Sequence, residues 1–220
     1  MRLDNMVKQK LRLRLSVLLM TILAYLTASV PAMSYEEPEY SIVKKTEVYE
    51  VRKYKKRTVA EVIYSEEGNG FRLLFEYISG ANKGIKDVKM TTPVTHSKKI
   101  DMTVPVTQST TNGKISMRFF LPQKYSKRNA PLPINEKISI IDLPIEYFAV
   151  ISYSGFSSDY NFEKHYTELK NALDKDGVVI KGPPIKASYN SPFTLPFLRR
   201  NEAMYPLKLN QGTRRRSIYL

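Results

Sequence analysis

The sequence of 220 residues contains no cysteine and no tryptophan, and its two histidines, His96 and His165, lie far apart. Without cysteine the chain cannot form disulfide bonds, thiolate-ligated metal sites or a catalytic thiolate. The sequence also lacks a paired-histidine metal motif, a nucleophile elbow and a phosphate-binding glycine loop. These absences exclude several large classes of enzyme, and no catalytic residue is predicted.

Basic residues exceed acidic ones, with a formal net charge of +14. The excess is spread over the chain, and only Arg2–Arg14 and Arg214–Arg216 form tight clusters. This spacing favours an ordinary solvated surface over a dedicated binding face. An anionic ligand or an anionic membrane surface is the alternative. No nucleic-acid-binding module is recognisable, so nucleic acid is not an expected partner.

The N-terminus has the pattern of an export signal. Five basic residues precede Leu15, and an apolar run from Leu15 to Ala32 ends in small residues. A basic start, an apolar centre and a small-residue exit are typical of a secretory signal. We therefore predict that residues 1–32 are a signal peptide, cleaved after Ala32, or an uncleaved signal anchor, since about 18 apolar residues approach the length that spans a bilayer. The protein is then periplasmic or secreted, with membrane contact through this segment if it is retained.

The remaining chain predicts one domain of the α+β class. Residues 33–40 are expected to be a linker, 41–209 the folded domain and 210–220 a disordered basic tail. Amphipathic spacing predicts helices over residues 66–80 and 158–175. Period-two alternation predicts antiparallel strands over residues 46–54, 58–64, 100–106, 115–121, 138–140, 147–153, 178–180 and 185–189. The short basic segment Lys55–Arg57 predicts that the first two strands form a hairpin.

A six-residue motif occurs twice, twelve residues apart, as Met90–Thr95 and Met102–Thr107. Pro93 and Pro105 each lack a donor for a sheet ladder, which places both copies at a sheet edge, a strand start or a bulge. The prolines and threonines are expected to bend the sheet. The methionines have pliable apolar side chains, and lining a pocket is an equally good interpretation for them.

Four stretches together resemble the SOUL haem-binding protein family, in its bacterial and plant branch. They are Tyr49–Tyr54, Phe71–Asn82, the two motif copies and Ser191–Glu202, in the family's order, and the resemblance covers roughly residues 41 to 207. It implies a twisted antiparallel β-barrel-like sheet with two flanking helices, built from two pseudo-duplicated βαβ-type halves.

The resemblance also implies that haem or another tetrapyrrole binds in an apolar pocket. The corresponding positions here are Phe71, Arg72 and Phe75 on the first helix and Tyr189, Pro192 and Phe193 on a loop near the C-terminus. Some relatives carry a histidine, proposed as an iron ligand, where this chain has Lys53. Protonated lysine cannot bind iron, so no metal ligand is predicted, and neither His96 nor His165 is singled out.

Three functional interpretations remain open from the sequence. The first is a non-catalytic carrier, buffer or sensor of a tetrapyrrole. The second is an enzyme that removes the metal from such a ligand or hydrolyses another apolar molecule, which rests on analogy between folds. The third is a basic module that binds membrane surfaces or other proteins. The oligomeric state is not predicted.

Overall fold

The computed structural model describes residues 35–65, 68–84 and 97–208, together with Arg14, Ser16, Val17 and Met20. The chain divides into two units, 1–34 and 35–220, and the description below concerns the second. Apart from those four positions, the predicted signal segment lies outside the described residues, as do the first motif copy, His96 and the tail 210–220. Within the described residues, no helix is long and apolar enough to cross a membrane.

The second unit combines antiparallel strands with two helices. In chain order its elements are β1 (Tyr40–Lys45), β2 (Glu50–Tyr54), β3 (Arg57–Tyr64), α2 (Gly70–Ser79), β4 (Asn82–Lys83), β5 (Val106–Thr111), β6 (Lys114–Phe120), β7 (Leu132–Pro133), β8 (Ile138–Leu143), β9 (Glu146–Tyr153), α3 (Asp159–Lys175), β10 (Ile185–Ser188), the 3-10 turn η1 (Pro196–Leu198) and β11 (Asn201–Pro206). The α+β class predicted from the sequence is confirmed.

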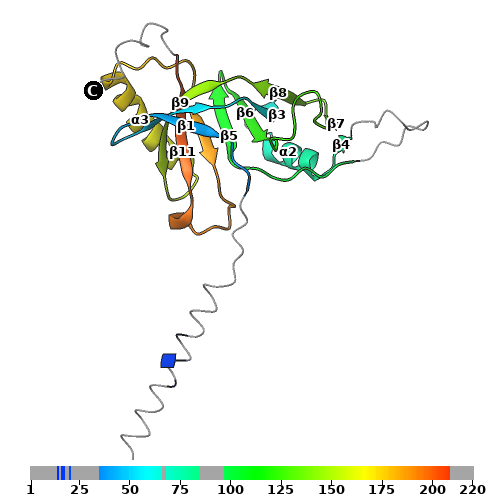
Figure 1. Ribbon diagram of the computed structural model, residues 1–220, viewed down its shortest axis with the longest axis horizontal. Helices are drawn as coiled ribbons and strands as arrows, with labels where there is room; N and C mark the ends of the chain where they lie inside the picture. The colour runs from blue at the N-terminus through cyan, green and yellow to red at the C-terminus, as the bar shows by residue number, and fades with distance from the viewer. Residues whose placement is uncertain are drawn as a thin grey trace, which may run out of the picture. The chain divides into compact units, whose positions relative to one another are not determined.

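Nine strands form one sheet in the order β1-β2-β9-β11-β10-β5-β6-β3-β8. Strand β2 is second in this order and β3 is eighth, yet only Lys55 and Lys56 join them. On a flat sheet six strand spacings would separate them by about 29 Å. The two-residue link reaches only about 10 Å. A second two-residue link, Pro144–Ile145, joins β8 at one end of the order to β9 near the other. The sheet must therefore curl into a half-barrel, as Figure 1 shows.

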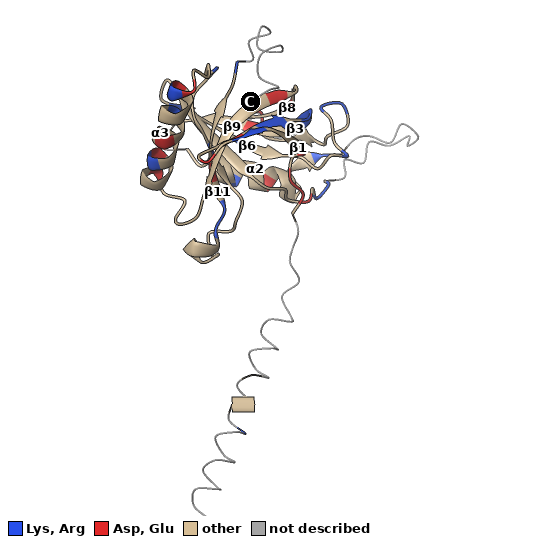
Figure 2. Ribbon diagram, turned by 60° about the vertical axis from the view of Figure 1, so that its left-hand side comes forward, with Lys and Arg blue, Asp and Glu red and all other residues tan. Residues whose placement is uncertain are grey.

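The two helices cover the outer face of the curled sheet, toward its two ends (Figure 1). Helix α2 packs on β3 and β6, and α3 packs on β9 and β11. Each helix buries its apolar stripe in a separate core, with Leu74 and Tyr77 of α2 in one and Leu169 and Leu173 of α3 in the other. The exposed face of α3 carries charges of both signs (Figure 2). Two helix-on-sheet halves are the arrangement that the sequence predicted.

The inner face of the curl is filled by side chains that come from both ends of the sheet. Tyr54, Phe148 and Met204 form part of one buried cluster. The guanidinium carbon of Arg57 lies 4.5 Å from the ring centroid of Tyr54 and 5.4 Å from those of Phe120 and Phe148. These contacts join β2, β3, β6 and β9 across the interior, so this part of the half-barrel is packed. A hollow of about 690 Å³ remains on the same inner face, lined by residues that include Glu61, Arg118 and Ile185.

Several local predictions can be compared with the observed elements. Ser158 caps α3 through a hydrogen bond from the Asn161 amide, 3.2 Å, and Gly80 ends α2 with a φ of 126°, so both helices lie within the predicted ranges 66–80 and 158–175. The predicted hairpin of residues 46–64 is wrong, because β2 pairs with β1 and β9, whereas β3 pairs with β6 and β8. Two adjacent strands with a short turn look alike in sequence whether or not they pair.

The second motif copy also differs from its predicted structure. Residues 100–105 are not a strand, and the Val104–Pro105 peptide bond is cis. The chain joins the sheet only at Val106, where β5 begins. The expectation that Pro105 lies at a strand start is confirmed, whereas the predicted strand over residues 100–106 is wrong. Strands β1, β4, β7 and β11 were not predicted from the sequence. The predicted strand over residues 178–180 is also wrong, because only an isolated bridge between Ile180 and Leu207 forms there.

Candidate functional site

A cavity of about 680 Å³ lies on the outer face of the sheet, between α2 and the start of α3. This volume is within the usual range for small-molecule sites. Its walls come from four parts of the chain: the first turn of α2, the segment 102–108 with β6, the residues just before α3, and the loop after β10. Tyr35, from the segment predicted as a linker, closes one side.

The floor of the cavity is built from the second motif copy. Met102, Val104 and Val106 alternate toward the cavity, together with Met117 of β6. The intervening residues of the copy face the other side of the chain and line different hollows. A strand-like alternation on each side of the cis proline therefore places one thioether and two branched apolar side chains under the cavity. Pocket lining, which was one interpretation of the motif's methionines, is observed for Met102.

Helix α2 supplies an aromatic wall because its first turn is well anchored. The side chain of Asn69 accepts a hydrogen bond from the Arg72 amide, 2.9 Å, and so caps the helix. Phe71 then projects from the first turn, with its ring 5.3 Å from that of Phe119 in an edge-on contact and 6.0 Å from that of Phe75. Phe71 remains 43% exposed, so part of its ring is available to a ligand.

The loop between β10 and β11 forms the opposite wall, and Arg199 holds it in shape. The Arg199 guanidinium donates from Nε to the carbonyl of Thr194, 2.7 Å, and from Nη2 to the carbonyl of Pro192, 2.5 Å. The Gly155 amide donates to the carbonyl of Pro196, 2.9 Å, which ties the loop to the segment before α3. The wall is thus ordered by hydrogen bonds that leave its apolar side chains free.

Tyr189 connects this wall to a buried polar cluster. Its hydroxyl donates to Oε2 of Glu202, 2.7 Å, and the Arg200 guanidinium lies 3.6 Å from the centre of its ring. Burial, together with the Glu202 carboxylate, raises the pKa of the Tyr189 hydroxyl well above its usual value. Glu202 is fully buried and also accepts from Arg52, 3.0 Å, and Ser152, 3.1 Å. The phenol therefore stays neutral and its ring is rigidly placed on the cavity wall.

Two cationic side chains contribute to the cavity lining. Lys186 of β10 donates from Nζ to the carbonyl of Ser157, 2.9 Å, and pairs with Asp159, 3.0 Å. Asp159 is itself almost fully exposed. The second cation is Arg199. A mostly apolar cavity with two cations at its border suits a ligand that is apolar in its body and anionic at one side.

The six residues predicted as the binding site fall into two groups. Phe71, Tyr189 and Pro192 line the cavity. Arg72 instead points along the helix surface toward Glu76, with 3.9 Å between Nη1 and Oε1. Phe75 lies one turn beyond Phe71 and Phe193 is 94% exposed, and neither is among the lining residues. Contact of any of them with a ligand stays a prediction.

The sequence pattern did not indicate the cations of the cavity, and it indicated the floor only in part. Lys186, Arg199 and Phe156 line the cavity, although nothing in the local sequence marks them. The alternation of Met102 with Val104 and Val106 was a detectable signal. It predicted one apolar face without showing that this face is left partly uncovered between the two helices.

No histidine is among the described residues that line this cavity, and His96 lies outside the described residues. Among the described residues, no group of three or more His, Asp or Glu side chains could hold a metal ion. His165 lies on α3 with its ring stacked 4.2 Å from that of Tyr153, and neither it nor Lys53 lines the cavity. The thioethers of Met102 and Met117 are soft donors on the floor. The apolar lining and its cations fit a tetrapyrrole ring with carboxylates, and Tyr35, Met102 and Met117 are potential iron donors among the described lining residues.

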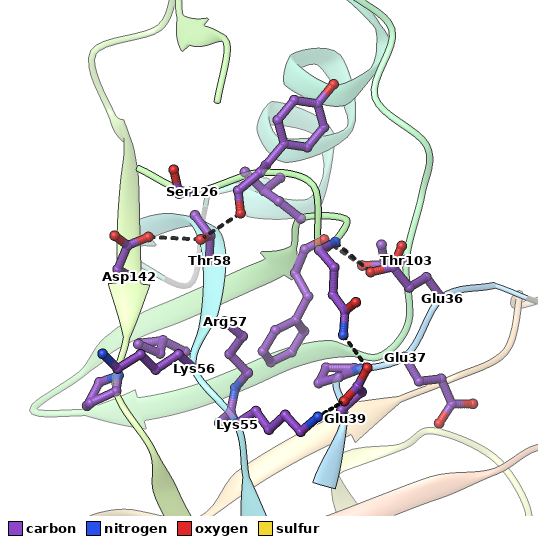
Figure 3. A pocket seen from close by; sticks show the side chains of 17 residues that line it. Glu36, Glu37, Glu39, Lys55, Lys56, Arg57, Thr58, Thr103, Ser126 and Asp142 are labelled. Carbon is purple, nitrogen blue, oxygen red and sulfur yellow. Dashed lines mark hydrogen bonds and ion pairs between the residues drawn. The ribbon is translucent and has the colours of Figure 1, made fainter. Parts of the chain in front are cut away.

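A second hollow of about 640 Å³, drawn in Figure 3, has a different character. Several of its charged groups bond to neighbouring side chains, although Nε and Nη1 of Arg57 are buried without a hydrogen-bond partner. Glu39 contacts Lys55 and accepts from Nε2 of Gln123, and these hydrogen bonds lower the pKa of the Glu39 carboxyl. Thr58 donates to Asp142, 2.8 Å. These pairs fasten the segment after Tyr35 to the seam where β2 passes into β3, so we assign this hollow a structural role.

The sequence matches the family described as SOUL heme-binding protein over residues 35–206. The chain belongs to this family. The match covers both helices, the described motif copy and the whole cavity lining, so a tetrapyrrole is the ligand class that the family suggests. A search of curated proteins found no matching sequence.

The fold is similar to that of one solved domain. The C-terminal domain of EcmrR is similar with a TM-score of 0.53 at 11% identity, over 78% of this chain and 99% of that domain. A hydrolase from Listeria innocua gives 0.48 at 8% identity, over 76% and 94% of the two chains. SAV2435 bound to tetraphenylphosphonium gives 0.42 at 13% identity, over 73% and 93%. At these identities the likeness concerns the fold alone.

Proposed function

We propose that this SOUL family protein binds haem or another tetrapyrrole in the cavity beside α2, as a carrier, buffer or sensor. The observation that supports this most directly is the composition of the cavity lining. Apolar side chains form its floor, Phe71 and Tyr189 provide two aromatic walls, and Lys186 and Arg199 stand at its border.

The energetics of such binding follow from apolar burial. Covering several hundred Å² of macrocycle and wall removes that area from water at about 25 cal/mol/Å², which is sufficient for micromolar binding without an iron bond. The propionates of the ligand would pair with Lys186 and Arg199. Binding therefore needs no axial histidine, in keeping with Lys53.

The direct test is titration of haem and of metal-free porphyrin into the purified protein, followed by absorbance. We expect both to bind with dissociation constants below about 10 μM. If neither does, the proposal fails. Similar affinities for the two would show that iron ligation adds little, whereas much tighter binding of haem would point to the thioethers of Met102 and Met117.

The chain offers a matched pair of variants for locating the site. Phe71 and Phe75 are on the same helix with exposed fractions of 43% and 47%, and only Phe71 lines the cavity. Covering the exposed part of a phenylalanine ring, about 80 Å², contributes about 2 kcal/mol. Phe71→Ala should therefore weaken porphyrin binding by about 30-fold, and Phe75→Ala by much less. Equal losses of porphyrin affinity in the two variants would show that the ligand binds outside this cavity.

Export remains part of the proposal. The basic and apolar pattern of residues 1–32 supports a periplasmic or secreted location, with the segment cleaved or kept as an anchor. Cell fractionation with mass determination of the mature N-terminus tests both statements. A chain found in the cytoplasm with its first residues intact would contradict export.

A further inference from the structure

The interior of the half-barrel contains a small cavity that borders two arginines. Its volume is about 30 Å³, and both Arg57 of β3 and Arg118 of β6 line it. Tyr54 and Thr107 add hydroxyl groups, and the other lining residues are apolar, so there is no carboxylate among the described residues of the lining. A cavity of this size holds one water molecule or one ion of similar size.

The guanidinium of Arg57 has buried donors without an acceptor. The Arg57 side chain is only 10% exposed. Its Nε and Nη1 atoms are fully buried and have no hydrogen-bond partner among the described residues. The guanidinium packs between the rings of Tyr54, Phe120 and Phe148, and all three rings line the cavity. Because a buried donor without an acceptor destabilises the folded state, we expect an acceptor at this position.

Each of the two arginines has one carboxylate nearby, and neither carboxylate satisfies it. Nη2 of Arg57 lies 3.6 Å from Oε2 of Glu146, which is longer than a hydrogen bond. Arg118 donates from Nε to Oε1 of Glu61, 2.7 Å, and its two Nη groups have no hydrogen bond to the described residues. A guanidinium carries five N–H donors and no acceptor. Both side chains therefore retain donors for a further partner.

The charges around the cavity favour an anion over water as that partner. Burial lowers the pKa of the Arg57 guanidinium and the nearby charge of Arg118 acts in the same direction, although Glu146 opposes both effects. The guanidinium nevertheless stays protonated in a protein, so two positive charges border the cavity. Water would need acceptors for its own two protons, whereas an anion only accepts. Its attraction to both arginines is also strengthened by the low dielectric constant of the interior.

We propose that this cavity binds one small monovalent inorganic anion, of the size of chloride, between Arg57 and Arg118. The open hollow of about 690 Å³ on the same inner face shares Arg118, Phe148 and Ile185 with the cavity, which gives the ion a path from solvent. The anion accepts hydrogen bonds from both guanidiniums and compensates their charge. Since Arg57 of β3 also packs on Tyr54 of β2, the bound anion stabilises the closed form of the half-barrel.

The second motif copy separates the anion site from the cavity beside α2. Pro105 and Thr107 line the anion site, whereas Val104 and Val106 line the other cavity. Alternation along the chain places neighbouring side chains on opposite sides in this way. The anion site lies behind the floor of the tetrapyrrole site and shares no lining residue with it, so the two proposals do not depend on each other.

Unfolding at constant ionic strength tests the anion site. Urea unfolding of the full chain is measured while chloride replaces gluconate, an anion too large for the cavity. For one site that exists only in the folded state, each tenfold rise in chloride above the dissociation constant should multiply the folding equilibrium constant by about ten. Bromide should act like chloride, and sulfate should not. General salt effects have the opposite order, because sulfate stabilises proteins by exclusion from their surface.

A pair of variants on β6 locates the effect. Arg118→Lys keeps the positive charge beside Glu61 and removes the guanidinium donors, and Arg118 is 32% exposed, so the substitution disturbs the interior less than one at Arg57. It should raise the chloride concentration for half-maximal stabilisation by about tenfold, the loss of one charge-assisted hydrogen bond. Lys114→Gln removes a charge from the same face of β6 at the open hollow, outside the cavity lining. It should leave the chloride dependence unchanged.

Anomalous scattering from crystals grown in bromide gives a direct measurement on the unsubstituted protein. We expect a bromide peak beside Arg57 and Arg118. A folding equilibrium that does not change when chloride replaces gluconate would overturn the proposal and leave water as the partner of Arg57. Equal effects of Lys114→Gln and Arg118→Lys would show diffuse attraction to the groove, and bromide found only at other positions would also refute the site. All these measurements are made without tetrapyrrole, so they can fail while porphyrin binding stands.

Discussion

Tyr54 gives the sharpest test of the packed barrel interior. Its side chain is only 4% exposed, under the Arg57 guanidinium and against Phe148. Burial, and secondarily the negative charge of Glu202, raise the pKa of the Tyr54 hydroxyl to about 12, although Arg52 and Arg57 oppose the change. In the unfolded chain the same hydroxyl titrates near its ordinary value of about 10.

The sign of the effect on stability follows from these two values. Below about pH 10 the hydroxyl is protonated in both states and its contribution is fully present. Between about pH 10 and pH 12 the unfolded state loses the proton while the folded state keeps it, so unfolding becomes progressively more favourable. Two pKa units correspond to about 3 kcal/mol of unfolding free energy for this one group. Well above the pKa of the folded state, the hydroxyl is ionised in both states, and this group causes no further loss of unfolding free energy.

The substitution Tyr54→Phe keeps the ring and removes the titrating group. We expect the wild-type protein to lose about 3 kcal/mol more unfolding free energy than the variant between about pH 9 and pH 12. Urea unfolding followed by circular dichroism measures this difference. Tyrosinate absorbance, which no tryptophan obscures in this chain, reports when each hydroxyl ionises. Parallel loss of stability in both proteins would show that water reaches Tyr54 and that the interior is not closed.

Three further substitutions test the cavity lining. Lys186→Met should weaken haem binding by about tenfold and leave binding of a porphyrin dimethyl ester unchanged; an equal loss for both ligands would refute propionate pairing. Tyr189→Phe keeps the ring on the wall but removes a donor to Glu202, so urea unfolding should show a loss of about 1–3 kcal/mol with porphyrin affinity unaltered. Unchanged stability would mean that this buried hydrogen bond is dispensable. Arg72→Ala should change the affinity for porphyrin by less than about twofold, because an exposed pair with Glu76 contributes little. A larger change in the porphyrin titration would show that Arg72 contacts the ligand.

Local patterns in the sequence were sufficient for the helices and for most strands. The amphipathic stripes of α2 and α3 depend on neighbouring residues, and both helices were predicted within a few residues of their observed bounds. Pairing was not predictable to the same degree. The link at Lys55 and Lys56 reads as a hairpin turn, and only the closure of the whole sheet shows that β2 and β3 lie at opposite ends of the strand order. Strand β11 is buried on both faces, so it lacks the alternation that marks a half-exposed strand.

The candidate site was predictable only in part, for a related reason. The resemblance led to Phe71 and Tyr189, which line the cavity, and also to Phe193, which does not. A shared stretch of sequence specifies that a loop is present without specifying which of its side chains point inward. Lys186 reaches the cavity because β10 lies beside β5, where it pairs with Gln108, 78 residues earlier in the chain. Nothing in the sequence next to Lys186 indicates that its side chain lies at the cavity.

The two dipeptides that close the half-barrel affect the cavity from the opposite side of the sheet. Neither Lys55–Lys56 nor Pro144–Ile145 belongs to a strand, so lengthening them would leave every strand pairing unchanged. Their length instead determines how tightly the sheet curls. Since α2 and α3 are carried on the outer face toward different ends of that sheet, tighter curling moves the helices apart and relaxation brings them together. The width available to a ligand is therefore adjustable, in evolution or by design, through four residues that no ligand touches.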